Sequence, residues 1–196
     1  MAVTDHGEID GALEIAKIAP FKVIIGEEVL TPYGEIIGLF IKEKIASPCS
    51  PEEAISKIKK QGGIVVIPHP FDTLRSTALK PEILEKLIKE EVVNALEGIN
   101  GRVIYASHNK AAQKHAREHQ LLITAGSDSH RVDEIGNVFL EMPEFETPCE
   151  FLASLKEAGI VDRRSAVFGV RFRALWERAA NRKEAKKSHY VEKKDV

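Results

Sequence analysis

The sequence predicts an α/β fold in which buried strands alternate with helices around a mainly parallel sheet. Short continuous apolar runs such as IVVI (64–67) recur along the chain, as expected for strands that are buried on both faces. Helical patterns of about ten residues or more separate most of these runs, which is the spacing of parallel β-α-β units. An open sheet and a barrel both satisfy this pattern.

The first half of the chain predicts a strand stub, a hairpin and two helices. Residues 1–4 form the stub, and a helix within 7–20 ends at Pro20. The turn residues TPYG separate runs 21–31 and 34–41, which indicates a hairpin-like pair. The helix within 50–63 has signals at both ends: Ser50 as N-cap, Pro51 in the first position, Glu53 for a capping box, and Gly62 and Gly63 as terminators.

The second half continues the alternation of strands and helices to about residue 168. Strands are expected within 64–70, 92–100, 121–130, 137–142 and 161–168, and helices within 80–90, 107–120 and 147–159.

Composition indicates a soluble globular protein with one domain and a tail. The 196 residues are 43% hydrophobic and 30% charged, and we place the domain at 1–162 and the tail at 163–196. The net charge of -2 favours no nucleic-acid or membrane partner, and no apolar run reaches the about 18 residues of a membrane span. With no leader pattern, the expected location is cytoplasmic. Cys49 and Cys149 are expected to be structural thiols.

Acidic residues and histidines follow the ends of the predicted strands. In parallel α/β folds these ends lie on one face, so the side chains are expected to converge. Imidazole and carboxylate ligands without thiolate suit zinc, manganese or iron. A single histidine at a strand end is more often structural, but four such ends together favour a metal site. Asp128 and His130 would point the same way if their strand continued. The candidate residues are His6, Glu27 or Glu28, His69, Glu97, Asp128 and His130.

The ordered motifs TDHG, GEEVLT followed by GEI, PHPF, EGINGR and AGSDSH resemble those of the PHP (polymerase and histidinol phosphatase) superfamily, from about residue 2 to about residue 145. The resemblance implies a distorted (β/α)7-type barrel that holds two or three metal ions and acts as a phosphoesterase on nucleotides or small phosphorylated metabolites. Its G-x-E spacing selects Glu28 over Glu27 as a bridging ligand, and Glu97 matches a ligand of some branches only. The ligands implied are His6, Glu28, His69, Glu97, Asp128 and His130.

The chain departs from the family pattern at its beginning. The H-x-H strand and first helix of the family have no counterpart, and none of the seven histidines forms an H-x-H motif. We therefore expect a barrel without its first β-α unit, fewer bound metals, and an open sheet edge that invites self-association. A truncated sequence lacking about 35 to 40 residues is the favoured explanation. The alternatives are a complete chain that self-associates and a degenerate, non-catalytic domain.

The implied reaction is phosphoester hydrolysis by a metal-activated hydroxide, with arginines holding the phosphoryl oxygens. The candidates are Arg75, Arg102 and Arg131, each with a surface role as its alternative. A second motif, HAREH (115–119), matches a zinc signature, but its helix is expected on the outside of the barrel, so we assign it no catalytic role.

The tail gives the alternative function. Residues 163–196 carry a local excess of basic side chains in an amphipathic pattern that fades into a solvated tail. A catalytically impaired PHP-like domain that binds protein or RNA through this tail is the competing hypothesis. Its association would be salt-sensitive and would need no metal.

Overall fold

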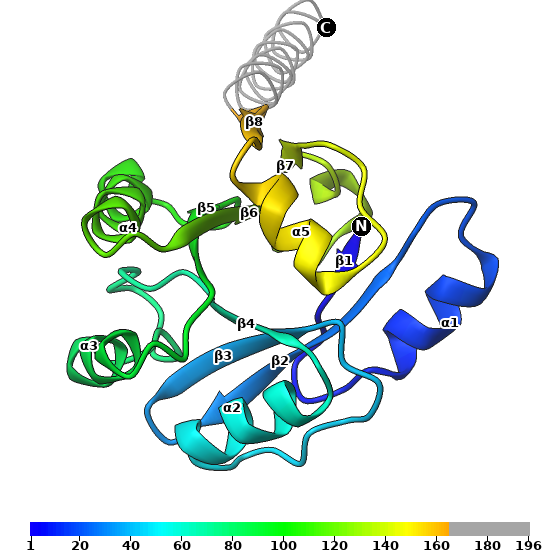
Figure 1. Cartoon of the computed structure of the whole chain (residues 1–196). Helices are drawn as coiled ribbons and strands as arrows, with labels where there is room; N and C mark the ends of the chain where they lie inside the picture. Colours follow the sequence, from blue (N-terminus) through cyan, green and yellow to red (C-terminus); the bar gives the residue numbers. More distant parts are fainter. Residues whose placement is uncertain (165–196) are drawn as a thin grey trace, which may run out of the picture. The chain divides into compact units, whose positions relative to one another are not determined.

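The computed structural model of the chain describes residues 1–164, and residues 1–161 form one compact unit. This unit is a mixed α/β structure whose main sheet curls into a half-barrel (Figure 1). The strands are β1 (Ala2–Val3), β2 (Ile24–Thr31), β3 (Gly34–Leu39), β4 (Ile64–Ile67), β5 (Ala95–Asn100), β6 (Leu122–Gly126), β7 (Val138–Glu141) and β8 (Gly159–Asp162). The helices are α1 (Asp10–Ile18), α2 (Pro51–Lys60), α3 (Pro81–Lys89), α4 (Ala106–Glu118) and α5 (Pro148–Leu155), with a 3-10 turn at Val132–Glu134.

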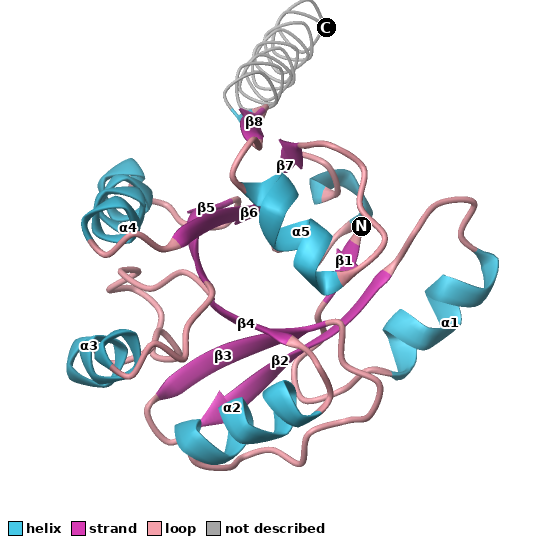
Figure 2. Cartoon of the chain, in the orientation of Figure 1, coloured by secondary structure: helices cyan, strands magenta, loops and turns pink. Residues whose placement is uncertain are grey.

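The main sheet has six strands in sequence order from β1 to β6, and β7 and β8 form a separate two-stranded sheet. β1 runs parallel to β2, and β4, β5 and β6 are parallel to one another, as expected. β3 is antiparallel to both neighbours, so the sheet is mixed rather than wholly parallel (Figure 2). The reversal is the hairpin at TPYG, where Gly34 adopts φ +126° in a turn that few other residues tolerate.

Helices cover both faces of the sheet. Val65 and Ile67 of β4 face one way, into a core that includes Ile58 of α2 and Leu84 of α3. Ile64 and Val66 face the other way and pack with Phe151 of α5. Figure 1 shows α2, α3 and α4 outside the curve of the sheet and α5 within it. Burial on both faces explains why IVVI is continuously apolar.

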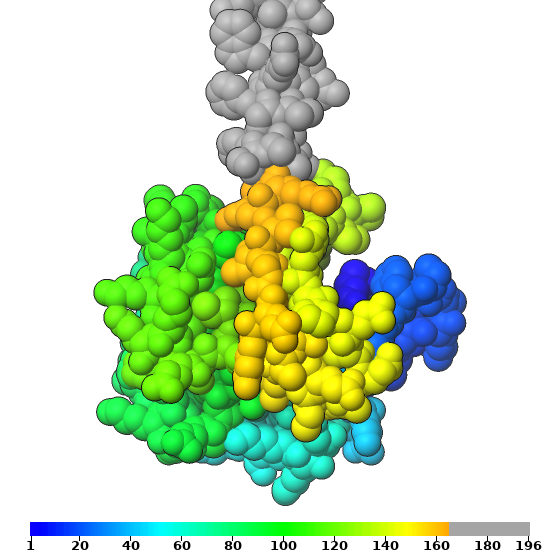
Figure 3. Space-filling view, turned by 45° about the horizontal axis from the view of Figure 1, so that its top comes forward, coloured from blue at the N-terminus to red at the C-terminus, as the bar shows by residue number. Residues whose placement is uncertain are grey.

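The N-terminal helix packs less completely than the others. Ala12 is the buried residue of α1, whereas Leu13, Ile18 and nearby Phe21 are exposed. In the space-filling view α1, in blue, stands at the side of the unit (Figure 3). α1 therefore covers its end of the sheet less completely than the other helices cover the centre.

The helices lie within the predicted ranges except α4, which begins at Ala106, one residue before the predicted range 107–120. Ser50 caps α2 by accepting a hydrogen bond from the Glu53 amide at 3.2 Å, and Thr147 forms a full capping box with Glu150 at α5. The final strand, expected at 161–168, begins earlier and is described as Gly159–Asp162, and residues 165–168 of the expected range lie outside the described residues. No helix within residues 1–164 is long and apolar enough to cross a membrane. The predicted tail beyond Arg164 lies outside the described residues, so the division at residue 162 stays a prediction.

Candidate metal centre

The segment after β1 carries His6 to the side of β2. The Glu28 amide donates to the Asp5 carbonyl at 3.0 Å, and the Gly7 amide donates to the Glu28 carbonyl at 3.0 Å. His6 and Glu28 thereby form an isolated parallel bridge that extends the pairing of β1 with β2. The short TDHG motif thus works by backbone pairing, which places the imidazole next to a strand carboxylate.

The β2–β3 hairpin brings two carboxylates to one face of the sheet. Leu30 pairs with Glu35, and Glu28, two residues before Leu30, pairs with Ile37. Since residues two apart on a strand share a face, Glu28 and Glu35 point to the same side. His6 Nδ1 lies 3.3 Å from Glu28 Oε2 and 3.1 Å from Glu35 Oε1. Glu35 is therefore a member of this site.

His69 completes the group from the loop that follows β4. Its Nε2 lies 3.2 Å from Glu28 Oε1 and 3.5 Å from Glu35 Oε2. The His69 backbone adopts φ +32°, and its amide donates to Glu97 Oε2 at 2.9 Å. This hydrogen bond to Glu97 of the neighbouring strand β5 fixes the loop that aims the imidazole at the two carboxylates.

Burial and charge oppose each other at His69. Burial acts to lower its pKa, but hydrogen bonds to Glu28 and Glu35 outweigh burial and raise the pKa to about 9. At Glu35 burial acts to raise the pKa, yet hydrogen bonds from His69 and Thr77 hold it below its usual value. The raised pKa keeps His69 protonated at neutral pH, so its imidazolium supplies a positive charge beside the two carboxylates.

A second set of contacts gathers the predicted ligands of β5 and β6. Asn100 Nδ2 donates to Glu97 Oε2 at 2.9 Å and to Asp128 Oδ2 at 3.1 Å. Asp128 Oδ2 also accepts a short hydrogen bond from Arg75 Nη2. Burial raises the pKa of Glu97 to about 7, although its hydrogen bonds from Asn100 and His69 act in the opposite direction. Asn100 thus links two of the predicted ligands.

Asp128 and His130 come together by a different route from the one expected. β6 ends at Gly126, so the strand does not continue through them, and Asp128 has φ +49°. Their proximity instead comes from the loop: His130 Nδ1 lies 3.1 Å from the Asp128 carbonyl oxygen and 3.5 Å from its Oδ1. The His130 ring centroid is 6.0 Å from that of His6. His130 therefore lies near the exposed side of the His6 group.

The three candidate arginines differ in their surroundings. Arg75 is largely buried and contacts Asp128 and, at 3.5 Å from its Nε, Asp72 Oδ2. Arg102 lies 3.7 Å from Glu134, and Arg131 binds Asp133 at 3.0 Å on the surface. Only Arg75, among the three, contacts a predicted metal ligand.

Glu27 faces the outer helical layer, as the alternation of the strand requires. It is fully buried, and its Oε2 accepts a hydrogen bond from the Ile45 amide at 2.8 Å. Burial raises its pKa, which favours the neutral acid on this side of the sheet. The two adjacent glutamates therefore have separate environments, and Glu28 is the one that meets the histidines.

The donor set fits a divalent metal ion. His6, Glu28 and Glu35 each offer a ligand atom, and these atoms lie within 4.8 Å of one another. Glu35 Oε2 is buried and meets His69 Nε2 at 3.5 Å, so a cation could take the place of this long contact. Two imidazoles with two carboxylates suit zinc, manganese or iron. With His69, these residues could hold a cation that replaces the imidazolium charge.

A family model and a curated relative each match part of the chain. A family model described as PHP-associated matches residues 106–159. The uncharacterized protein MJ0417 of Methanocaldococcus jannaschii is 35% identical over 141 residues, which cover 68% of this chain and 60% of that protein. The chain thus spans about 60% of the length of this relative.

Three solved structures share the fold at low sequence identity. PsfC from Pseudomonas syringae has a TM-score of 0.61 and 16% identity, covering 89% of this chain and 83% of that one. An amidohydrolase from Chromobacterium violaceum has a TM-score of 0.58 and 18% identity, and the match covers 83% of this chain and 87% of that one. A putative metal-dependent phosphoesterase from Bifidobacterium adolescentis has a TM-score of 0.52 and 17% identity, and the match covers 66% of this chain and 77% of that one. Because their names differ, the shared fold does not by itself choose a reaction.

Proposed function

We propose that the chain is a metal-dependent phosphoesterase of the PHP superfamily. The PHP-associated match at residues 106–159 supports this proposal, and so does the fold that the chain shares with a structure named a putative metal-dependent phosphoesterase. The proposed substrate is a small phosphorylated metabolite or a nucleotide. The observation that carries the proposal is the meeting of His6, Glu28, Glu35 and His69, whose facing nitrogen and oxygen atoms lie 3.1 to 3.5 Å apart.

The four residues divide the work of holding a metal ion. Glu28 and Glu35 each contact both imidazoles, one through each oxygen, so both are placed to bridge two ions, and the G-x-E spacing of the family motif selects Glu28 for that role. Zinc, manganese or iron held here would supply a Lewis acid and lower the pKa of a bound water. Glu35 contributes negative charge from the opposite strand, and the burial of both carboxylates strengthens the electrostatic attraction for a cation.

Asp128 and Arg75 connect metal binding to substrate binding in this proposal. Asp128 Oδ2 accepts a hydrogen bond from Arg75 Nη2. A metal ion bound to this oxygen would compete with the guanidinium for it. When Asp128 serves as a ligand, Arg75 is left to bind an anion, and its planar guanidinium matches phosphoryl oxygens. Asp72 Oδ2 lies 3.5 Å from Arg75 Nε, and this ion pair keeps the Arg75 side chain near the site.

Two neighbouring glutamates provide a matched test of the proposal. We expect Glu28→Gln to lower both metal content and hydrolysis of 4-nitrophenyl phosphate at least about 100-fold, because losses of 10- to 100-fold already follow from mutating residues that only support a ligand. Glu27→Gln should leave both unchanged, since Glu27 faces the opposite layer and glutamine retains an acceptor for the Ile45 amide.

The two readouts are metal content after dialysis against zinc or manganese and initial hydrolysis rates. Metal loading without any phosphoesterase activity on a panel of phosphomonoesters and nucleotides would argue against the reaction. Equal losses in the Glu27→Gln and Glu28→Gln variants would argue against the site.

A further inference from the structure

A second group of potential metal ligands lies on the helices, apart from the strand-end group. It consists of Glu85 on α3 with His115 and His119 at the end of α4. One ligand atom from each residue lies within 4.8 Å of the others. Within residues 1–164, only this group and the one around Glu28 bring three such side chains so close together. The group therefore needs an explanation of its own.

α4 places the two imidazoles of this group one turn apart. Residues at i and i+4 share a helix face, and the ring centroids of His115 and His119 are 4.4 Å apart. The His119 amide donates to the His115 carbonyl at 3.1 Å, so the last turn of backbone fixes their spacing. The HAREH motif thus builds a histidine pair, although on the outside of the sheet.

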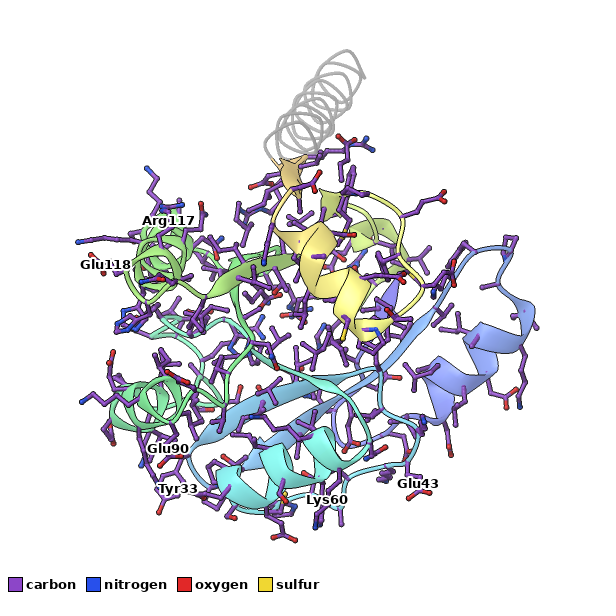
Figure 4. All side chains as sticks on the ribbon, viewed as in Figure 1. Tyr33, Glu43, Lys60, Glu90, Arg117 and Glu118 are labelled. Carbon is purple, nitrogen blue, oxygen red and sulfur yellow. The ribbon has the colours of Figure 1, made fainter. Side chains whose placement is uncertain are left out.

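The acidic ligand comes from a neighbouring helix and not from the motif itself. Glu85 Oε1 lies 3.0 Å from His115 Nε2. In contrast, Glu118 is exposed and lies 3.6 Å from Lys114, and Figure 4 places Glu118 and Arg117 on the outer side of α4. The glutamate of the formal zinc signature is therefore not the residue that meets the histidines.

The surroundings of His115 leave one position unfilled. Its Nε2 is shielded from solvent and makes no hydrogen bond, although Glu85 Oε1 lies 3.0 Å away and forms an ion pair with a protonated imidazole. The Phe71 ring packs edge-on at 5.2 Å between centroids and holds the imidazole in place. Buried polar atoms are usually paired, so a ligand is expected at this nitrogen.

The charges at this position favour a cation. The carboxyl end of a helix carries partial negative charge, and the carboxylate of Glu85 adds a full one. Two imidazoles and one carboxylate suit zinc, with a fourth position left for water, whereas magnesium and calcium prefer oxygen ligands throughout. In a tetrahedral zinc site the ligand atoms are about 3.3 Å apart, close to the observed His115–Glu85 distance.

We propose that Glu85, His115 and His119 form a second metal site, which binds a zinc-class divalent ion and cross-links α3 to α4. Its role is structural: binding to the folded state alone stabilises that state. The site also abuts the loop of the strand-end group, because Phe71 follows His69 by two residues and packs on His115. The inference does not depend on phosphoesterase activity.

Zinc stoichiometry of the full chain tests the site, with Glu28→Gln as the background so that the strand-end group contributes less. We expect Glu28→Gln/His119→Ala and Glu28→Gln/Glu85→Gln to bind the helix-site zinc at least about tenfold more weakly than Glu28→Gln alone. Each should also retain one zinc ion fewer per chain after dialysis. Glu28→Gln/Glu118→Gln should match the background in both respects.

Thermal unfolding with and without zinc supplies the second readout. Zinc should raise the Tm of Glu28→Gln and of Glu28→Gln/Glu118→Gln, and the rise should shrink in the other two variants. His119 is exposed and Glu85→Gln is nearly isosteric, so both metal-free variants should fold. Equal zinc retention in all four proteins, or an equal loss in the Glu118→Gln variant, would overturn the proposal.

Discussion

The strand-end group has a buried half and an open half. Glu28, Glu35 and His69 are at most 6% exposed, whereas the side chains of His6 and His130 are about half exposed, at 55% and 48%. Strand pairing and the Glu97 hydrogen bond position the buried half. The open half lies on the loops that follow β1 and β6. The buried half is thus pre-organised, and the open half gains most from a bound ligand.

Replacing one histidine from each half gives the largest expected contrast. His69→Ala leaves Glu28 and Glu35 buried without their positive partner, which should lower the free energy of unfolding by about 3–5 kcal/mol. His6→Ala should cost less than about 1 kcal/mol, because its ion pairs are exposed on one side. Urea unfolding of the metal-free proteins measures both. Similar losses in the two variants would contradict the division into halves.

The pH dependence of the free energy of unfolding of the metal-free chain tests the charge of the His69 imidazolium. The pKa of His69 rises from the ordinary 6.5 to about 9 on folding, so its stabilisation is complete below pH 6.5 and is lost as pH rises through 9. The expected loss is on the order of 2–3 kcal/mol over that window. Urea unfolding at pH 6, 7.5 and 9 with a chelator should show it. His69→Gln should flatten the profile, and an unchanged slope in that variant would assign the effect to other groups.

Two glycines test how firmly the hairpin holds the buried half. A Cβ on Gly34 would lie 2.4 Å from the Leu79 Cα at φ +126°, so Gly34→Ala should destabilise the chain by about 2–3 kcal/mol and displace Glu35. Gly62 also has a positive φ, of +76°, but nothing lies within 4 Å of its Cβ position. Gly62→Ala should therefore cost only about 1 kcal/mol. Thermal unfolding and metal content are measured for both variants. Equal losses of stability in Gly34→Ala and Gly62→Ala would show that the contact with Leu79 is unimportant.

The same contrast explains what the sequence could predict. Continuous apolar runs and helix caps located the strands and helices. Alternation showed only that one of Glu27 and Glu28 can face the site, and the G-x-E spacing of the family motif selected Glu28. Glu35 was missed although the hairpin was predicted, because ligands were sought only at the ends of parallel strands, whereas the antiparallel return of β3 carries Glu35 back to the site. The signal was present in the GEI that follows the TPYG turn. Periodicity could not place the Asp128–His130 loop, because a chain with positive φ follows no strand pattern.

Asn100 shows a second limit of pattern reading. It is only 1% exposed and donates to both Glu97 and Asp128, yet an amide at a strand end carries no metal-ligand signature. Its role follows from which carboxylates lie beside it, and that depends on the pairing of β5 with β6. Residues that support a ligand are therefore harder to predict from sequence than the ligand itself.

The arginines give the smallest expected effect on stability and separate a site role from a surface role. Arg75→Ala removes the partner of Asp128 and Asp72 and should lower the free energy of unfolding by about 1–2 kcal/mol. Arg131→Ala removes an exposed pair with Asp133 and should change the free energy of unfolding by less than about 0.5 kcal/mol.

If Arg75 binds the phosphoryl group, kcat/KM for phosphoester hydrolysis should also fall at least about tenfold in Arg75→Ala and remain near the parent value in Arg131→Ala. Arg75→Lys should restore stability more than rate, because lysine keeps the charge without the planar guanidinium. Equal rates for the Arg75→Ala and Arg131→Ala variants would place substrate binding elsewhere.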